Sequence, residues 1–94
     1  MDIARSDIVK STAGRDKGKL FFVLEVGEEF LLLADGKTRR LEKPKRKKRE
    51  HTAFPARYDC RVAEKIRSGE KFTNSELRRT LAQFGGDGNP DQEG

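Results

Sequence analysis

Two adjacent apolar segments constrain most strongly how this chain can fold. Residues 19–26 predict a strand, in which successive side chains point to opposite faces. Apolar side chains fall on both of these faces. Residues 30–34 form a second apolar run, and Asp35-Gly36 after it is a strong hairpin signal because both residues tolerate positive φ. A sheet with one face in water needs only one apolar face. We therefore expect another part of the chain to cover the second face.

Three further segments complete the predicted sheet. Residues 7–11 form a short β-branched strand at its start, and residues 37–41 follow the hairpin as a fourth strand. The stretch 42–50 is too basic for a core and begins as a loop, because Pro44 cannot donate a hydrogen bond to a central ladder. This stretch leads into a fifth strand, which we expect over residues 47–52.

The last third of the chain has a helical period. Asp59 can cap a short helix over residues 60–68, which Gly69 then ends. Residues 73–76, Thr-Asn-Ser-Glu, form a capping box that starts a second helix. The apolar stripe of that helix consists of Leu77, Leu81 and Phe84. These two helices are the predicted cover for the second face of the sheet.

The expected elements divide this single domain into three parts. Residues 1–53 hold the sheet with its basic loop, residues 54–85 hold a helical extension packed on it, and residues 86–94 form an acidic tail expected to be disordered. No apolar run approaches the length of a membrane span, and no signal peptide is apparent. The single cysteine, Cys60, excludes an internal disulfide. We expect a cytoplasmic monomer that does not contact a membrane.

Positive charge is concentrated in the middle of the chain. Residues 37–51 carry nine Lys or Arg and two Glu, whereas the whole chain has a net charge of only +5. A polyanion is the natural partner of such a block. The alternative is a solvated loop that only keeps the protein soluble.

The sequence offers little for catalysis. One histidine, His51, and one cysteine cannot fill a four-ligand zinc site, and a Cys–His nucleophile needs a third, orienting group. The glycines of residues 14–19 lack the spacing and the following helix of a phosphate-binding loop. We therefore expect no enzyme activity, cofactor, metal or small-molecule substrate.

The segment from residue 7 to residue 26, followed by Asp35-Gly36, resembles a KOW motif. Counted from Ile8, Gly18 occupies the eleventh place, where the motif has its essential glycine. With the basic stretch and the Thr73–Arg78 ending, residues 5–84 are similar to small bacterial KOW-domain RNA-binding proteins. Those in turn resemble KOW-containing large-subunit ribosomal proteins of archaea and eukaryotes. The resemblance implies an SH3-like barrel of about five strands, followed here by two C-terminal helices, and RNA contacts through its loops.

Three groups of basic residues are the candidate RNA-binding site. They are Arg15, Lys17 and Lys19 in the first loop, Lys37, Arg39 and Arg40 after the hairpin, and Lys43, Lys45, Arg46, Lys47, Lys48 and Arg49 in the basic stretch. In a barrel these groups can form one surface. Arg can fork onto phosphate and Lys supplies a mobile charge, so we expect recognition of RNA shape and backbone rather than sequence.

Several alternatives stay open at this point. Phe21 could be a base-stacking platform, although packing under the helices is favoured, and Phe54 and Tyr58 could stack on bases or join the core. The leading hypothesis is a ribosomal or ribosome-associated translation factor that binds ribosomal RNA. A protein-interaction module of the transcription or translation machinery is the second, because KOW domains of elongation factors also contact proteins. Duplex DNA binding is weaker, because no helix has a recognition-helix pattern.

Overall fold

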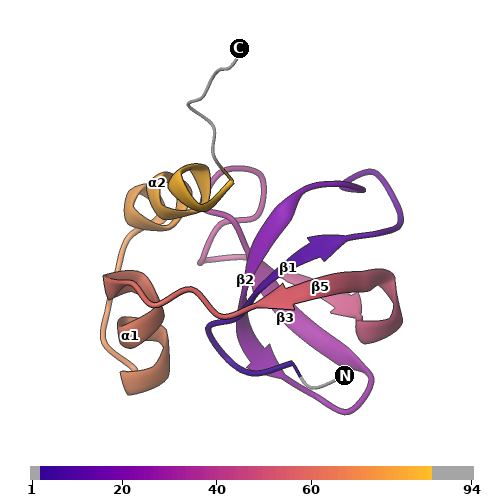
Figure 1. The fold of residues 1–94 in the computed structure, drawn as a ribbon, viewed down its shortest axis with the longest axis horizontal. Helices are drawn as coiled ribbons and strands as arrows, with labels where there is room; N and C mark the ends of the chain where they lie inside the picture. The colour runs from indigo at the N-terminus through magenta and orange to yellow at the C-terminus, as the bar shows by residue number, and fades with distance from the viewer. Residues whose placement is uncertain (1–2, 86–94) are drawn as a thin grey trace.

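The protein folds as a five-stranded antiparallel sheet followed by two helices (Figure 1). The structure is a computed structural model that describes residues 3–85, so the predicted acidic tail at 86–94 lies outside the described residues. The strand order is β4-β3-β2-β1-β5. The strands are β1 (Ile8–Ser11), β2 (Leu20–Val26), β3 (Phe30–Ala34), β4 (Lys45–Lys48) and β5 (Thr52–Ala56).

The apolar side chains of β2 serve two separate cores, as its two apolar faces predict. On one face, Phe22 packs with Ile8, Ala34 and the apolar side chains of both helices. On the other face, five side chains no more than 1% exposed form what we call the sheet cluster. Its members are Val9, Phe21, Val23, Leu31 and Leu33. Phe21 therefore neither stacks on a ligand nor packs under the helices, and both interpretations of it were wrong.

The two helices cover the second face of the sheet, which confirms that prediction (Figure 1). The first, α1, spans Arg61–Ser68, and its N-cap is Cys60 rather than the predicted Asp59, because the Cys60 Sγ accepts a hydrogen bond from the Ala63 N–H. It ends as predicted at Gly69, whose φ is 81°. The second, α2, spans Asn74–Phe84 and begins with the predicted capping box. None of the helices within residues 3–85 is long and apolar enough to cross a membrane.

The predicted fourth strand over residues 37–41 is wrong, because this segment is a loop. The Oδ1 of Asp35 accepts hydrogen bonds from the backbone N–H groups of Lys37 and Arg39, which a strand would offer to its neighbour. The loop then docks on the start of α2, where the N–H of Leu41 donates to the Asn74 Oδ1 at 2.8 Å. Local side-chain capping and tertiary docking therefore replace the hairpin.

The basic stretch supplies the missing strand. β4 pairs with β3, with Lys45 opposite Leu33 and Lys47 opposite Leu31, so residues 42–50 are not simply a loop. An edge strand tolerates such charge because lysines discourage pairing with a further strand. A 3-10 turn at Arg49–His51 leads into β5, which lies later than the predicted strand at 47–52 and crosses the predicted part boundary after residue 53.

Candidate nucleic-acid interface

The first loop and the basic stretch meet through a buried ion pair. The Nζ of Lys47 lies 2.7 Å from the Oδ1 of Asp16 and also donates to the Ala13 carbonyl oxygen at 2.8 Å. The Ser11 hydroxyl donates to the same Asp16 oxygen at 2.9 Å. Lys47 is only 7% exposed, so its ammonium holds the loop and is not available to RNA. This burial makes Lys47 the least accessible member of the predicted RNA-binding set, whose binding role stays a prediction.

The surroundings of Asp16 keep its carboxylate charged. Burial raises the pKa of Asp16, but hydrogen bonds from Lys47 and Ser11 and the positive charge of Lys47 together lower it by more. The net pKa therefore lies below its usual value of 3.8. The Asp16 carboxylate therefore stays ionised at neutral pH, and its contact with Lys47 fixes the first loop against β4.

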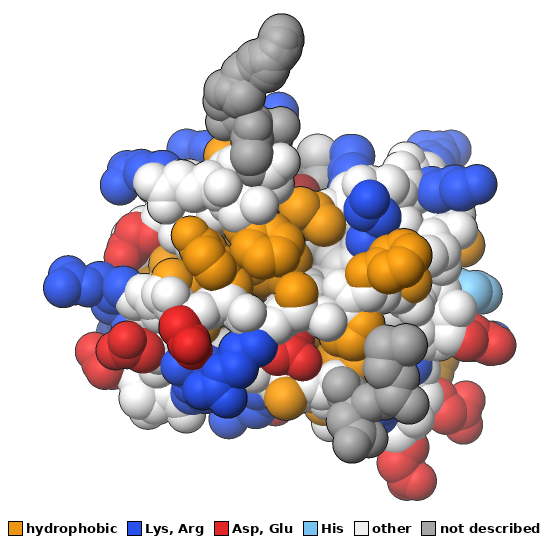
Figure 2. Space-filling model, in the orientation of Figure 1, with side chains coloured by type: hydrophobic (Ala, Val, Ile, Leu, Met, Phe, Trp, Pro, Cys, Tyr) orange, Lys and Arg blue, Asp and Glu red, His pale blue; other side chains and the backbone are white. Residues whose placement is uncertain are grey.

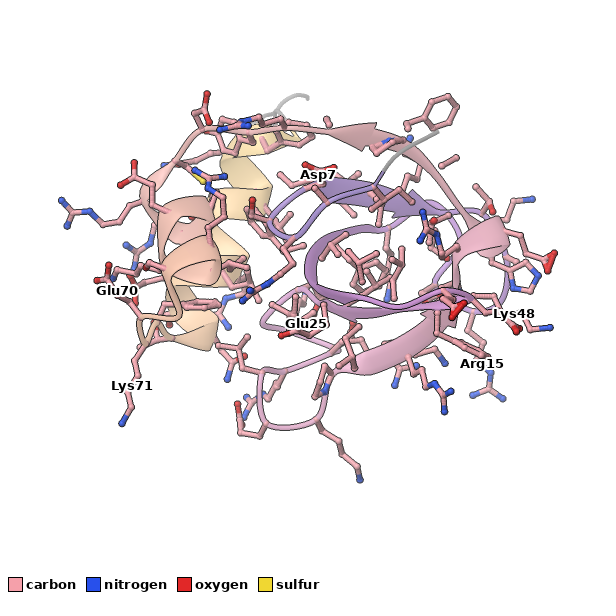
Figure 3. The ribbon with its side chains drawn as sticks, turned by 90° about the horizontal axis from the view of Figure 1, so that it is seen from below. Asp7, Arg15, Glu25, Lys48, Glu70 and Lys71 are labelled. Carbon is pink, nitrogen blue, oxygen red and sulfur yellow. The ribbon has the colours of Figure 1, made fainter. Side chains whose placement is uncertain are left out.

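This ion pair places exposed cations of two separate segments at one end of the molecule. Arg15 and Lys17 stand on the loop that Asp16 anchors, and both are exposed. Lys48 follows Lys47 in β4 with its side chain also exposed. Figure 3 shows Arg15 and Lys48 at the same end of the protein, whereas Lys71 lies at the opposite, helical end. We call Arg15, Lys17 and Lys48 the loop-end cations.

The second basic group lies beside α2 instead. Its loop is held there by the Arg78 guanidinium, which donates from Nη1 to the Gly36 carbonyl oxygen at 3.1 Å. Lys37 and Arg40 on this loop are exposed, whereas Arg39 is half-buried. The three predicted groups therefore do not gather around one hairpin end.

A groove links the first and second groups. It has a volume of about 850 Å³ and lies between α2 on one side and the β1–β2 hairpin and β5 on the other. Lys19 from the first group and Lys37 from the second both line it. Lys10 and Arg78 add two cations that the sequence analysis did not select. Its apolar lining includes Ile8, Leu20, Leu81 and Phe84.

Phe54 stands on the wall of this groove and is 74% exposed. Figure 2 shows an isolated hydrophobic projection over β5 with Lys and Arg side chains beside it. The second aromatic candidate behaves differently, because the Tyr58 ring packs 5.1 Å from the Phe84 ring against the helix-side core. Of the three aromatic residues considered for base stacking, Phe21 is buried, Tyr58 is half-buried and Phe54 is exposed.

Two arginines of the basic stretch face an acidic turn. The guanidinium of Arg46 lies 4.1 Å from the centre of the Phe30 ring and shares a surface depression with Glu25, Glu28 and Glu29. The guanidinium of Arg49 donates from Nη1 to the Gly27 carbonyl oxygen at 3.0 Å. These carboxylates reduce the local positive potential. Arg46 and Arg49 are therefore weaker candidates for phosphate contact.

The remaining predicted cations differ in exposure. Lys43 is exposed on the loop after β3, and Lys45 is half-buried on β4. His51 is exposed in the 3-10 turn, and Cys60 is half-buried at the start of α1. Among residues 3–85, no group of three or more His, Cys, Asp or Glu side chains could hold a metal ion.

No family model and no curated protein matches this chain. The inference of function therefore depends on its own surface. That surface combines the loop-end cations with a positively lined groove that exposes one aromatic ring. Cations contact phosphate and an aromatic face contacts a base, so this combination favours a nucleic-acid ligand.

Proposed function

We propose that this chain is a non-enzymatic RNA-binding protein on an SH3-like barrel of the KOW type, and that it binds structured ribosomal RNA as a ribosomal or ribosome-associated factor. The observation that carries the proposal is the buried Asp16–Lys47 pair. It fixes the basic first loop against a basic strand, so cations from two segments are held at one end of the fold. The KOW resemblance implies RNA contacts through this same first loop.

The barrel is supported by the burial of the sheet cluster. Its five side chains are at most 1% exposed, although both helices pack on the opposite face of the sheet. A flat sheet would leave the face that carries the sheet cluster in water. Burial without a helical cover fits a sheet that curls around the cluster. The hydrogen bond from Lys47 of the edge strand β4 to the β1–β2 loop also fits a curled sheet, because it joins strands that are not neighbours in the sheet. A curled sheet of five strands is what the KOW resemblance implies.

The distribution of charge supports RNA rather than an acidic protein surface. The loop-end cations are one Arg and two Lys at exposed positions. The Arg fork can bind one phosphate with two hydrogen bonds, and the flexible Lys stems can reach phosphates whose positions vary in irregular RNA. In structured RNA, bulges and loops offer phosphates outside the regular helix, together with splayed bases. If about five phosphates are neutralised, the logarithm of the affinity should fall with the logarithm of the salt concentration with a slope of about −3 to −4.

The test is a salt titration against a fragment of ribosomal RNA with matched charge variants. The test variant carries Arg15→Ala, Lys17→Ala and Lys48→Ala. The control variant carries Arg61→Ala, Lys71→Ala and Arg79→Ala, which removes the same charge from exposed positions of the helical part. We expect the test variant to bind more weakly and to lose about three-quarters of a unit of slope or more per contact removed, whereas the control binds like the wild type.

Two outcomes would contradict the proposal. A slope near zero for the wild type would remove the electrostatic contact with RNA. Equal losses in the two variants would mean that only total charge matters and that the loop end is not a site. Co-sedimentation with ribosomes at increasing salt separates the two partner classes, because retention that is insensitive to the test variant would favour a protein-interaction module.

A further inference from the structure

We propose that the groove between α2 and β5 receives one unpaired nucleotide of the bound RNA, with its base stacked on Phe54 and its phosphates beside Lys10, Lys19 and Lys37. This inference rests on the proposed function and assigns a second contact to it. The loop-end cations would hold the RNA backbone, and the groove would take a base that has left the RNA helix.

The backbone at Phe54 is the first argument. Its φ is +54°, a left-handed conformation that large side chains rarely adopt, and Pro55 follows it. A residue before proline normally prefers an extended conformation, so the position is unusual on two counts. The surrounding structure must maintain this strain, and such strain clusters at functional sites.

A β-bulge produces this conformation. Between the pairs Lys10–Ala53 and Ile8–Ala56, β5 advances by three residues while β1 advances by two. The extra residue falls at Phe54-Pro55, where the missing N–H of proline costs no ladder bond. Bulges re-aim side chains, and this one turns the Phe54 ring outward until it is 74% exposed. A strained backbone therefore presents an aromatic ring to solvent, and packing of the core gains nothing from it.

The lining of the groove selects the ligand. Lys10, Lys19 and Lys37 are exposed, and Arg78 is fixed by hydrogen bonds to the Gly36 carbonyl and the Ser75 hydroxyl. Asp35 also lines the groove, but its carboxylate already accepts bonds from its own loop. The groove therefore has a positive charge over an apolar floor. Its ligand should combine an anion with a flat apolar part, as a nucleotide does.

The size and openness of the groove favour a base from a single strand. Its volume of about 850 Å³ falls in the range of roughly 300–1,000 Å³ that is typical of small-molecule sites. A base in a helix has both faces stacked on its neighbours, so neither face is free for the Phe54 ring. A base in a loop or bulge can be splayed out and stacked on an aromatic side chain.

The experiment uses the full chain and a short single-stranded RNA that carries 2-aminopurine, a base whose fluorescence is quenched when it stacks. Phe54→Gly removes the ring and suits the observed φ, because glycine adopts positive φ without strain. Phe54→Leu keeps the apolar bulk without the ring, and Phe54→Tyr keeps a ring. Val26→Ala is the matched control, because Val26 is the other large apolar side chain exposed among residues 3–85 and does not line this groove.

We expect quenching by the wild type, by Phe54→Tyr and by Val26→Ala. Phe54→Gly and Phe54→Leu should bind the single-stranded probe about 5- to 150-fold more weakly, which corresponds to about 1–3 kcal/mol of stacking. Binding of a fully paired RNA duplex should be unchanged in all five proteins, and Phe54→Gly should melt no lower than the wild type. Falling affinity with retained or higher stability would mark the ring as functional.

The outcomes separate this inference from the proposed function. Unquenched probe on the wild type, or full affinity in both Phe54→Gly and Phe54→Leu, would overturn the groove contact. If the loop-end variant still lost affinity for ribosomal RNA, the proposed function would stand without it. If the wild type bound no RNA at all, both proposals would fall. If the 2-aminopurine RNA showed no quenching while an acidic peptide bound in the groove, the ligand of the groove would be a protein. That result would also overturn the inference.

Discussion

The ammonium group of Lys47 lies 2.7 Å from the Oδ1 of Asp16, and both side chains are more than nine-tenths buried. Lys47 belongs to the edge strand β4, whereas Asp16 belongs to the loop between β1 and β2, so the pair joins two basic segments that are far apart in sequence. A residue from the most basic stretch of the chain thus acts inside the fold. The next residue along the strand, Lys48, is exposed and can contact a ligand.

Removing one partner of this pair should destabilise the protein strongly. We expect Asp16→Ala to lower the free energy of unfolding by about 3–5 kcal/mol, because the Lys47 charge would stay buried without a carboxylate. Lys48→Ala, next along the strand and exposed, should change it by less than about 0.5 kcal/mol. Urea unfolding followed by circular dichroism measures both.

Replacing both partners tests whether the pair itself stabilises the fold. The Oδ2 of Asp16 is buried with no hydrogen-bond partner among residues 3–85, so its charge is only partly compensated. The double variant Asp16→Leu with Lys47→Met should therefore lose less stability than either single substitution, because no lone charge stays buried. If the double variant lost as much as the sum of the two single variants, the two residues would act independently, and the pair would not join the segments.

The same pair predicts how stability depends on pH. The pKa of Asp16 is below 3.8 in the folded protein, so in acid the folded state binds fewer protons than the unfolded chain. Its contribution is complete well above pH 3.8 and is lost as the pH falls from about 3.8 through the lower folded pKa. The pKa values of Glu42 and Glu76 are also lowered, by hydrogen bonds from Asn74 and Lys65 respectively.

The Asp16 contribution can be separated from the other two by a difference measurement. The stability of wild type minus that of Asp16→Asn should shrink as the pH falls below about 4, because Glu42 and Glu76 act equally in both proteins. Thermal unfolding at a series of pH values measures this. A difference that stayed constant down to pH 2 would show that Asp16 is not ionised against Lys47.

Two glycines with similar backbones should respond differently to alanine. Gly18 has φ +90° with open space where a Cβ would stand, whereas Gly36 has φ +78° and its Cβ would collide with the Asn74 carbonyl oxygen. Gly18→Ala should cost about 1–2 kcal/mol of backbone strain. Gly36→Ala adds overpacking of about 1–3 kcal/mol, because the loop could no longer dock on α2. Equal melting temperatures for the two variants would contradict this account of the docking.

Local sequence patterns predicted those elements whose causes are local. Apolar alternation gives β2, and the side chains of Thr73 and Glu76 cap the start of α2 as their spacing requires. The fourth strand failed because Asp35 caps its own loop, and because that loop docks on Asn74, which is distant in sequence. β4 was missed since its inward side chain is a lysine, whose partner Asp16 lies 31 residues away.

The candidate site was predictable in composition but not in arrangement. A basic sequence predicts exposed cations. It does not predict that Lys19 and Lys37 line the same groove, or that Arg46 shares a surface depression with three glutamates. The outward ring of Phe54 depends on a bulge, which is a property of strand pairing rather than of residue type. Lys10 was missed because it is an isolated cation in β1, and Arg78 was missed because, like Arg79 beside it, it lies off the apolar stripe of α2 and was taken for a solvated side chain.

The last prediction compares the surroundings of two cations, Lys17 and Arg46. Both are exposed cations in the predicted RNA-binding set. Lys17 stands on the loop that Asp16 anchors, whereas the guanidinium of Arg46 stacks on Phe30 and lies beside the carboxylates of the acidic turn. A phosphate near Arg46 would also meet those carboxylates, and their repulsion offsets the attraction of the arginine. A cation–π contact further occupies the face of the guanidinium.

We therefore expect Lys17→Ala to weaken binding of ribosomal RNA and to reduce the slope of log affinity against log salt by about 1. Arg46→Ala removes the same charge but should leave both affinity and slope close to those of the wild type. Binding isotherms at four or more salt concentrations distinguish the two. Should Arg46→Ala lose as much slope as Lys17→Ala, the RNA would run across β4 and the acidic turn. The interface would then have to be moved from the loop end to the outer face of that strand.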